Sequence, residues 1–276
     1  MRSGEIKCGD RIFNLGSRTY IMGILNLTPD SFSDGGKFTY IEDAIKHAHQ
    51  MVTDGADILD LGGESTRPGH AEVTAEEEIK RVLPVLKRLI SEVNAPISID
   101  TSKAAVAGCM LAAGAHMIND VWGLQKDPAM AGICAEYQVP VVLMHNQSGT
   151  EYAGDIMGEI AVFLKKSVEI ALAAGIKEHH IILDPGIGFG KTLEQNIEVI
   201  SRLLELGSLG YPILLGTSRK GMFGRILSLP PEERVEATIS TSVIGVTKGV
   251  DFIRVHDVKE NFRAVRVADA IVRKDK

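Results

Sequence analysis

Cysteine is scarce in this chain of 276 residues, with only Cys8, Cys109 and Cys134. Their odd number and wide spacing fit neither a disulfide framework nor a zinc site. An excess of positive charge is also lacking, because 30 Lys and Arg stand against 36 Asp and Glu, a net charge of -6. The chain therefore has no general attraction to nucleic acid or to an anionic membrane, and an anionic ligand must be held by a local basic cluster.

Long apolar runs are absent too. No stretch approaches the roughly 20 residues needed to span a bilayer, and the N-terminal sequence MRSGEIKCGD lacks the apolar segment of a signal peptide. We therefore expect a cytoplasmic protein. Hydrophobic residues at 45% and charged residues at 24% are ordinary for a soluble globular chain. No repeat, low-complexity tract or linker divides the sequence, so we expect one domain over residues 1–276.

Several short apolar runs, rich in Ile, Val and Leu, each end in polar residues or glycine. They lie at residues 21–26, 57–62, 96–100, 116–120, 140–145, 180–184, 212–218 and 251–256. Runs of this kind without strict polar alternation are typical of parallel strands covered by helices. Helical patterns follow at residues 40–55, 74–93, 102–115, 127–138, 160–175, 193–207, 232–249 and 258–274.

This order of strands and helices predicts an α/β fold, the (β/α)8 TIM barrel, whose typical size is roughly 250 residues. A doubly wound open sheet is the alternative. Residues 5–20 indicate a β-hairpin with its turn at Gly9 and Asp10, capping the N-terminal bottom of the barrel. Thr74 and Glu77 predict a capping box for the helix at 74–93, in which Pro84 predicts a kink or a late start.

Active sites of such barrels lie at the C-terminal ends of the strands, so the residues that close the apolar runs are site candidates. They are Asn26, Gly62 to Glu64, Asp100, Asn119, Asp120, Met144, His145, Asp184, Ser218, Lys220, Arg254 and His256. Strand ends also meet solvent, which would explain some of these polar residues without a function.

Arg254 and His256 stand at i and i+2 of one strand and therefore share a face, while Ile253 and Val255 face the other way. Two potential cations in a barrel mouth suggest an anion site, and a phosphate site near the last two strands is a recurring barrel feature. The alternative is a structural ion pair.

Asp100, Asn119 and Asp184 offer acceptors and an amide donor, which suits a flat heterocycle with amide and amino edges. Buried carboxylates are costly unless they are paired or used, so two in one mouth suggest a ligand with N–H donors or developing positive charge. Each of the three residues could instead orient a neighbouring side chain.

The stretch DPGIGFGKT, residues 184–192, does not have P-loop spacing. It predicts a glycine-rich turn in which Phe189 lies over a ligand; a tight turn with a core Phe is the alternative. In GTSRKGMFG, residues 216–224, we expect Lys220 to work at the mouth, although a surface basic pair is possible. No Ser-His-Asp order with a nucleophile elbow is present, and His47 and His49 lie on a predicted helix where they would be solvated.

Seven ordered stretches carry a family resemblance over nearly the whole chain: MGILNLTPDSFSDGG, DLGGESTRPG, ISIDTSK, INDVWG, ILDPGIGFGK, LLGTSRK and FIRVHDV. With these, the chain resembles the dihydropteroate synthases, the folate-pathway enzymes that sulfonamides target. The resemblance implies condensation of (7,8-dihydropterin-6-yl)methyl diphosphate with 4-aminobenzoate to 7,8-dihydropteroate and pyrophosphate. It also implies Mg²⁺, an SN1-like route and a homodimer.

The resemblance also assigns roles to residues. It places the pterin against Asp100, Asn119, Met144, Asp184, Phe189, Gly216 and Lys220, and the diphosphate against Asn26, Thr66, Arg254 and His256, with Asn26 facing the metal. It places 4-aminobenzoate against Phe32, Thr66, Arg67, Pro68 and Lys220. Catalysis would rest on Asp100, Lys220, Arg254 and His256. Gly221 stands where a serine often stands in the family. The contacts of that serine with 4-aminobenzoate are therefore not carried over to this chain, and neither is the family's response to sulfonamides.

Two other functions are compatible with parts of the sequence. A pterin-binding methyltransferase domain that acts on methyltetrahydrofolate has no diphosphate to bind, so Arg254 with His256 favours the synthase. A barrel that binds pterin without catalysis is disfavoured because no expected group is missing. The polar loop that ends the stretch 21–36 is expected to be poorly ordered without ligand and ordered once pterin and pyrophosphate with Mg²⁺ are bound.

Overall fold

The structure is a computed structural model that describes residues 4–27, 37–64 and 73–273, without the side chains of residues 37–39. The expected ordering of the loop in the stretch 21–36 concerns residues 28–36, which lie outside these ranges. The same holds for four residues assigned to the aminobenzoate and diphosphate sites, which are Phe32, Thr66, Arg67 and Pro68.

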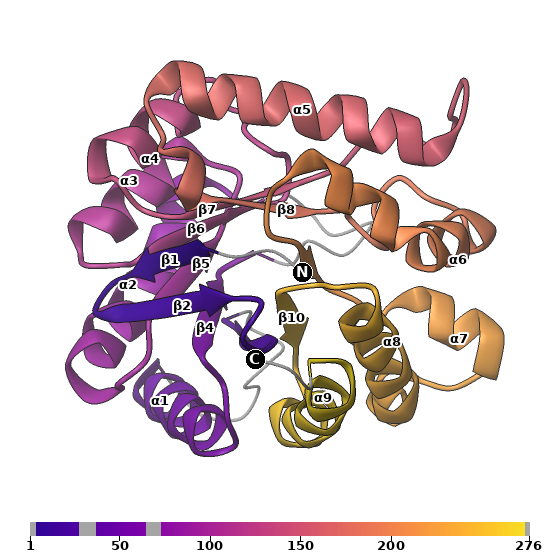
Figure 1. The fold of residues 1–276 in the computed structure, drawn as a ribbon. Coiled ribbons are helices and arrows are strands. Elements are labelled where there is room, and N and C mark those ends of the chain that lie inside the picture. The colour runs from indigo at the N-terminus through magenta and orange to yellow at the C-terminus, as the bar shows by residue number, and fades with distance from the viewer. Residues whose placement is uncertain (1–3, 28–36, 65–72, 274–276) are drawn as a thin grey trace.

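Parallel strands form a nearly closed barrel (Figure 1). The eight-stranded sheet has the order β8-β7-β6-β5-β4-β3-β10-β9. Its strands are β3 (Tyr20–Asn26), β4 (Ile58–Gly62), β5 (Ile97–Asp100), β6 (Met117–Asp120), β7 (Val141–Met144), β8 (Ile181–Asp184), β9 (Leu214–Leu215) and β10 (Phe252–Val255). The edges meet where Leu183 pairs with Ile213 and the Leu183 N–H donates to Pro212 O over 2.9 Å. The barrel prediction is confirmed, and the open sheet is excluded.

Helices surround the barrel (Figure 1). They are α1 (Lys37–Thr53), α2 (Ala75–Glu92), α3 (Ala104–Ala112), α4 (Met130–Tyr137), α5 (Ile156–Ala174), α6 (Leu193–Ser201), α7 (Gly221–Leu227), α8 (Val235–Thr247) and α9 (Val258–Val272), with the 3-10 turns η2 (Glu178–His180), η3 (Leu203–Leu209) and η4 (Pro231–Glu233). Among the described residues, no helix combines the length and apolar character that crossing a membrane requires.

Several helix boundaries depart from the sequence prediction; α1, for example, begins at Lys37, three residues before the predicted start. Helix α5 begins four residues early, at Ile156, because Asp155 caps it by accepting the Gly158 N–H at 3.0 Å. Helix α7 was not predicted, since seven residues are too few to show a helical period. The pattern at 193–207 breaks after Ser201 and continues as the 3-10 turn η3.

Helix α2 starts where the capping motif predicted. The Thr74 hydroxyl accepts the Glu77 N–H at 3.3 Å, but the Glu77 carboxylate pairs with Arg81 at 3.1 Å and does not return to the cap. Only half of the predicted capping box is therefore formed. The helix runs unbroken from Ala75 with Pro84 inside, so the late start is wrong.

Alternation along each strand sorts side chains between two surroundings. Ile118, for example, packs among the residues facing the helices, whereas Met117 belongs to a cluster inside the barrel. That cluster is the lower layer of the interior, with Tyr20, Met22, Ile58, Met117, Val142, Ile182, Leu214 and Phe252. Two residues further along the same strands comes the upper layer, with Asp60, Asn119, Met144, Asp184, Gly216 and Arg254, to which Asp100 of β5 is added.

A two-stranded antiparallel hairpin, β1 (Gly4–Cys8) with β2 (Arg11–Leu15), turns at Gly9 and Asp10 as predicted. Its apolar side chains join the lower layer, and the Phe13 ring meets Phe252 edge-on with 5.7 Å between centroids. The hairpin therefore closes the N-terminal mouth of the barrel.

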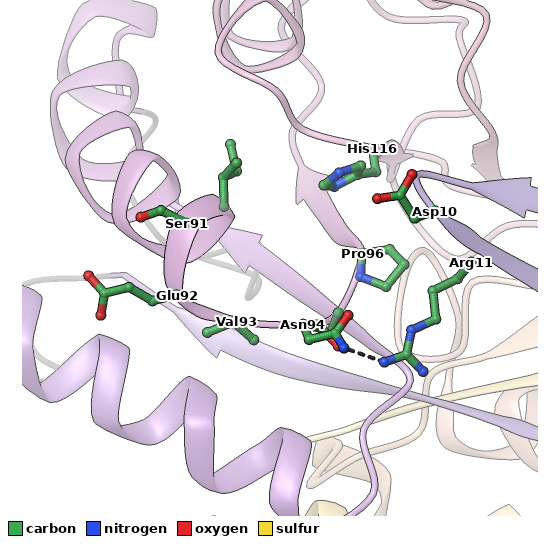
Figure 2. Close-up of a pocket in the computed structure, with 10 residues that line it drawn as sticks. Asp10, Arg11, Ser91, Glu92, Val93, Asn94, Pro96 and His116 are labelled. Carbon is green, nitrogen blue, oxygen red and sulfur yellow. Dashed lines mark hydrogen bonds between the residues drawn. The ribbon is translucent and has the colours of Figure 1, made fainter.

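A hollow of about 340 Å³ beside the hairpin turn is lined by Asp10, Arg11, Asn94 and His116 among others (Figure 2). The Arg11 guanidinium crosses it and donates to Asn94 O over 2.6 Å. This hollow lies at the N-terminal ends of β5 and β6, away from the upper layer.

Candidate active site

Arg254 links the polar groups of the upper layer. Its Nε donates to Asp60 Oδ2 over 2.6 Å and its Nη2 donates to Asp100 Oδ2 over 2.7 Å. The Asn119 amide also donates to Asp60 Oδ2, over 3.0 Å. The ion pair that the sequence left as an alternative for Arg254 is thus present in the structure, and it brings Asp100 and Asn119 together as predicted.

Asp60 is the partner that sequence reasoning missed. It is fully buried in the middle of β4, and only the residues at the end of that apolar run were site candidates. The available signal was its position two residues before Gly62, which places it on the same face as a strand end.

Two carboxylate oxygens in this layer have no hydrogen-bond partner among the described residues. Asp60 Oδ1 and Asp100 Oδ1 are buried and accept no hydrogen bond from the residues the structure describes. Buried acceptors left unfilled are costly. Burial raises the pKa of Asp100 to about 7, although the Arg254 charge opposes this. The site thus holds acceptors that a ligand with N–H groups can satisfy.

Asp184 is held by the glycine-rich turn that follows β8. Its Oδ1 accepts the Gly186 N–H at 2.7 Å, and burial raises the pKa of Asp184 to about 6 against the effect of that hydrogen bond. Gly186 has φ +69°, and a Cβ there would lie 1.9 Å from His145 O, so only glycine fits. Phe189, in the same turn, is half-buried and lies 4.1 Å from Lys220 Nζ, measured to the ring centroid.

His256 is fixed on two sides. Its Nδ1 lies 2.9 Å from Ser218 Oγ and its Nε2 lies 3.3 Å from Asn26 Nδ2. The Ser218 hydroxyl also accepts the His256 backbone N–H at 3.0 Å. Ser218 and Asn26 therefore set the plane of the imidazole at the mouth.

The neighbouring basic residues have separate surroundings. The Arg219 Nε donates to Asp257 Oδ2 over 2.9 Å, while Lys220 lies against Phe189. Lys220 is thus the one of the two that contacts a residue assigned to the pterin slot.

Two glycines leave room between these side chains. A Cβ on Gly216 would sit 3.8 Å from both Arg254 Cβ and Asp184 Oδ2, and one on Gly62 would lie 3.6 Å from Asp100 Cβ and 3.8 Å from Asn26 Oδ1. A Cβ at either position would make ordinary van der Waals contacts with these groups and cover part of the surface between them. Met144, almost fully buried, closes the β7 end.

A charged cluster stands at the base of the segment 65–72. The Lys103 ammonium bonds Glu64 Oε2 at 2.5 Å and Glu78 Oε2 at 2.7 Å, and Glu64 Oε1 accepts the Val73 N–H at 2.8 Å. The residues on either side of the segment are thereby held together.

Within the described ranges, no three His, Cys, Asp or Glu side chains gather as a metal cluster. Mg²⁺ commonly binds through one or two protein oxygens together with substrate phosphates and water. The Asn26 carbonyl oxygen, near Asp100 across Gly62, is a donor of that kind. The donor set therefore fits a metal that arrives with a phosphorylated substrate.

The comparisons with known proteins agree with this chemistry. The profile of the family described as "Pterin binding enzyme" matches residues 22–256. A dihydropteroate synthase from Clostridium beijerinckii is 56% identical over 98% of this chain and 100% of its own length.

Solved structures are equally similar. A dihydropteroate synthase from Clostridium difficile, crystallised in the presence of pteroic acid, has a TM-score of 0.93 and 58% identity, covering 95% of this chain and 99% of the other. One from Xanthomonas albilineans with 4-aminobenzoic acid has a TM-score of 0.93 and 40% identity, covering 98% of both chains.

The barrel with its buried carboxylate and guanidinium layer is thus of the pterin-binding class. The chain belongs to the pterin-binding enzyme family and, within it, to the dihydropteroate synthases.

Proposed function

We propose that the chain condenses (7,8-dihydropterin-6-yl)methyl diphosphate with 4-aminobenzoate, giving 7,8-dihydropteroate and pyrophosphate in folate biosynthesis. One observation carries the proposal most directly. The unfilled acceptors of Asp60 and Asp100 adjoin the Arg254 guanidinium in one buried layer. Acceptors suit the N–H edge of a pterin, and a cation beside them suits its diphosphate.

The pterin would lie flat across the upper layer. Asp100, Asn119, Asp184 and Lys220 would bond its edge, and Met144, Phe189 and Gly216 would line the slot. The hydrogen bond from Asn119 to Asp60 and the unfilled oxygen of Asp100 support this placement. Each N–H that reaches a buried carboxylate would remove part of its desolvation cost.

The diphosphate would lie toward β10, against Asn26, Thr66, Arg254 and His256. Arg254 can serve the carboxylates and the anion together, because its Nη1 makes no hydrogen bond with the described residues. In the proposed SN1-like route, the bond from the methylene carbon to the diphosphate oxygen breaks and its electron pair leaves with pyrophosphate. The amine of 4-aminobenzoate then bonds that carbon and loses a proton.

The residues present make this route reasonable. The carboxylates of Asp60 and Asp100 would stabilise the pterin cation, and Arg254 with His256 would stabilise the departing anion. No covalent nucleophile is required. Mg²⁺, held by Asn26 and the diphosphate, would neutralise negative charge on the leaving group.

The remaining assignments rest on the family. We propose that 4-aminobenzoate binds Phe32, Thr66, Arg67 and Pro68 together with Lys220, and that two chains form a homodimer, each as one domain over residues 1–276. Light scattering of the purified protein gives its molar mass in solution and so tests the homodimer.

Product formation tests the function. The purified chain is incubated with the pterin diphosphate, 4-aminobenzoate and Mg²⁺, and dihydropteroate is sought by mass spectrometry. We expect product in this mixture and little after chelation of the metal. Absence of product, beside an active control synthase, would refute the proposal.

A further inference from the structure

We propose that Lys191 is a positioning residue for pterin binding. Its ammonium group, together with His145, holds the turn of residues 186–189 in the conformation that forms one side of the pterin slot. The inference rests on the proposed function and adds to it a residue that does not touch the substrate. Lys191 lies in the glycine-rich stretch of residues 184–192, which lacks the spacing of a P-loop.

All the contacts of the Lys191 ammonium go to this turn and its support. Nζ lies 2.9 Å from Gly186 O, 3.0 Å from Phe189 O and 2.9 Å from His145 Nδ1. The residue is 8% exposed. An ammonium has three N–H donors, so three acceptors satisfy it completely.

The turn that Lys191 holds is itself bonded to groups assigned to the pterin site. The Gly186 carbonyl that Lys191 holds also accepts the Phe189 N–H at 3.2 Å, and the Gly186 N–H donates to Asp184 at 2.7 Å. The Phe189 ring lies under Lys220. Moving the turn would therefore displace Asp184, Phe189 and Lys220 together.

Burying an ammonium group that has no carboxylate in hydrogen-bond contact costs desolvation free energy. Burial lowers the pKa of Lys191 to about 7, so the ammonium form is complete only below neutral pH, where the contacts described here are strongest. Burial also lowers the pKa of His145 to about 3, so its imidazole is neutral and Nδ1 can accept from Nζ. His145 in turn packs edge-on against Phe163 at 4.9 Å between centroids, which fixes its ring. The arrangement therefore serves to position the turn rather than to increase the stability of the fold.

Arg273 offers a control at the other end of the barrel. It is also a buried cation, 7% exposed, and donates to Val250 O at 2.9 Å and Thr19 Oγ1 at 3.0 Å. Unlike Lys191, it also pairs with a carboxylate, Asp269 Oδ1, at 2.8 Å. It contacts no residue of the upper layer in these bonds. Removing it should destabilise the fold without changing the pterin slot.

The test measures binding of 6-hydroxymethylpterin by calorimetry, a probe without diphosphate. We expect Lys191→Met to raise Kd about tenfold, as loss of a charge-assisted hydrogen bond would. His145→Leu should raise it about threefold, whereas His145→Asn, whose amide oxygen can replace Nδ1, should stay within about twofold of wild type. Arg273→Met should leave Kd unchanged. In turnover, KM for the pterin diphosphate should rise more than KM for 4-aminobenzoate, because Lys220 is the one residue that the turn contacts and that both proposed sites share.

Equal Kd values for Lys191→Met and Arg273→Met would overturn the inference, as would equal losses in His145→Leu and His145→Asn. If Lys191→Met does not fold, the two His145 variants decide the matter alone. A wild-type protein that neither binds the pterin nor forms dihydropteroate would refute the proposed function instead, so the two failures are distinguishable.

Discussion

The lower and upper layers of the barrel interior are built on the same strands, two residues apart, yet they have opposite chemistry. Phe252 and Ile58 of the lower layer are fully buried in apolar surroundings and sealed by the hairpin. Two residues further along the same strands, the partly buried Arg254 pairs with the fully buried Asp60 over 2.6 Å. Strand geometry alone therefore does not decide which layer stabilises the protein.

The difference lies in what each layer lacks. Apolar burial in the lower layer lowers the free energy of the fold without further partners. The upper layer retains unfilled acceptors on Asp60 and Asp100 and carboxyl groups whose pKa values are raised by burial. We infer that the ligand supplies the missing partners, so substitutions in the two layers should affect different measurements.

The largest effect on turnover is expected for Arg254→Ala in the upper layer. It removes the guanidinium that faces two carboxylates and, by our proposal, the diphosphate. We expect kcat/KM to fall by at least about 10³-fold, mainly through lost diphosphate binding. Calorimetry with the diphosphate substrate measures this, and wild-type affinity in the variant would show that the anion site is misassigned.

The matching change in the lower layer is Phe252→Ala. The ring packs against Phe13 and Tyr20, with 5.6 Å between the centroids of Phe252 and Tyr20. We expect a loss of about 3–5 kcal/mol in the free energy of unfolding, measured by urea denaturation. Turnover per folded molecule should stay close to wild type; a large fall in kcat without a change in stability would contradict the division between layers.

A smaller, pH-dependent effect is expected for Asp184→Asn. Burial raises the pKa of Asp184 from 3.8 to about 6, so the folded state favours the protonated carboxyl. That contribution to stability is present at low pH and is lost as pH rises through about 6. The Asn variant cannot ionise and can still accept the Gly186 N–H.

Thermal unfolding at two pH values measures this difference. The midpoint of Asp184→Asn should exceed that of wild type by several degrees at pH 8 and match it at pH 4. The same difference at both values would mean that the carboxylate is not destabilising the ligand-free protein.

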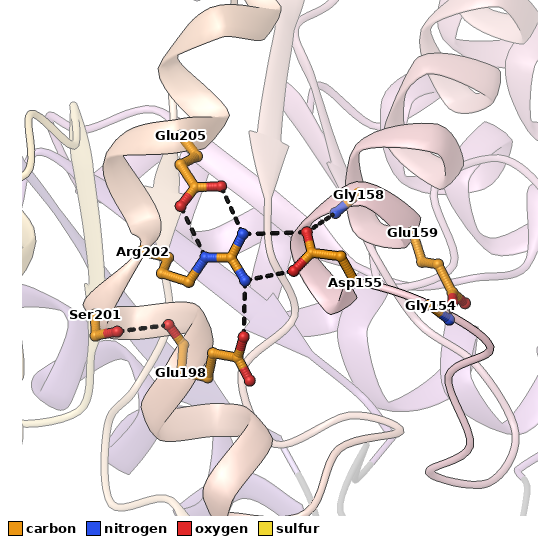
Figure 3. Close-up of polar contacts among 8 residues, drawn as sticks. All are labelled: Gly154, Asp155, Gly158, Glu159, Glu198, Ser201, Arg202 and Glu205. Carbon is orange, nitrogen blue, oxygen red and sulfur yellow. Dashed lines mark hydrogen bonds and ion pairs between the residues drawn. The ribbon is translucent and has the colours of Figure 1, made fainter.

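The smallest effect is expected outside both layers, for Arg202→Ala. Arg202 pairs with Asp155, Glu198 and Glu205 on the surface (Figure 3). Solvent screens such pairs, and Asp155 would still cap α5. We expect the melting midpoint to fall by less than about 2 °C, less still at high salt, with turnover unchanged. A larger fall would give this cluster a structural weight that exposed ion pairs rarely have.

Much of the architecture was predictable from the sequence. Apolar runs ending in polar residues marked the strands, and the turn at Gly9 and Asp10 marked the hairpin. The two-residue period also predicted the common face of Arg254 and His256. These features are local, so a short stretch of sequence is enough to specify each of them.

Only the tertiary structure decided which groups meet. Arg254 bonds Asp60 although 194 positions separate them, and Lys191 bonds His145 across 46 positions. Neither contact follows from a local period, because closure of the barrel and the register of neighbouring strands bring the partners together. The sequence by itself determined which residue types line the mouth. The closed barrel decided that a partly buried arginine pairs with two buried carboxyl groups there, since charge in such an interior is stable only beside its partners.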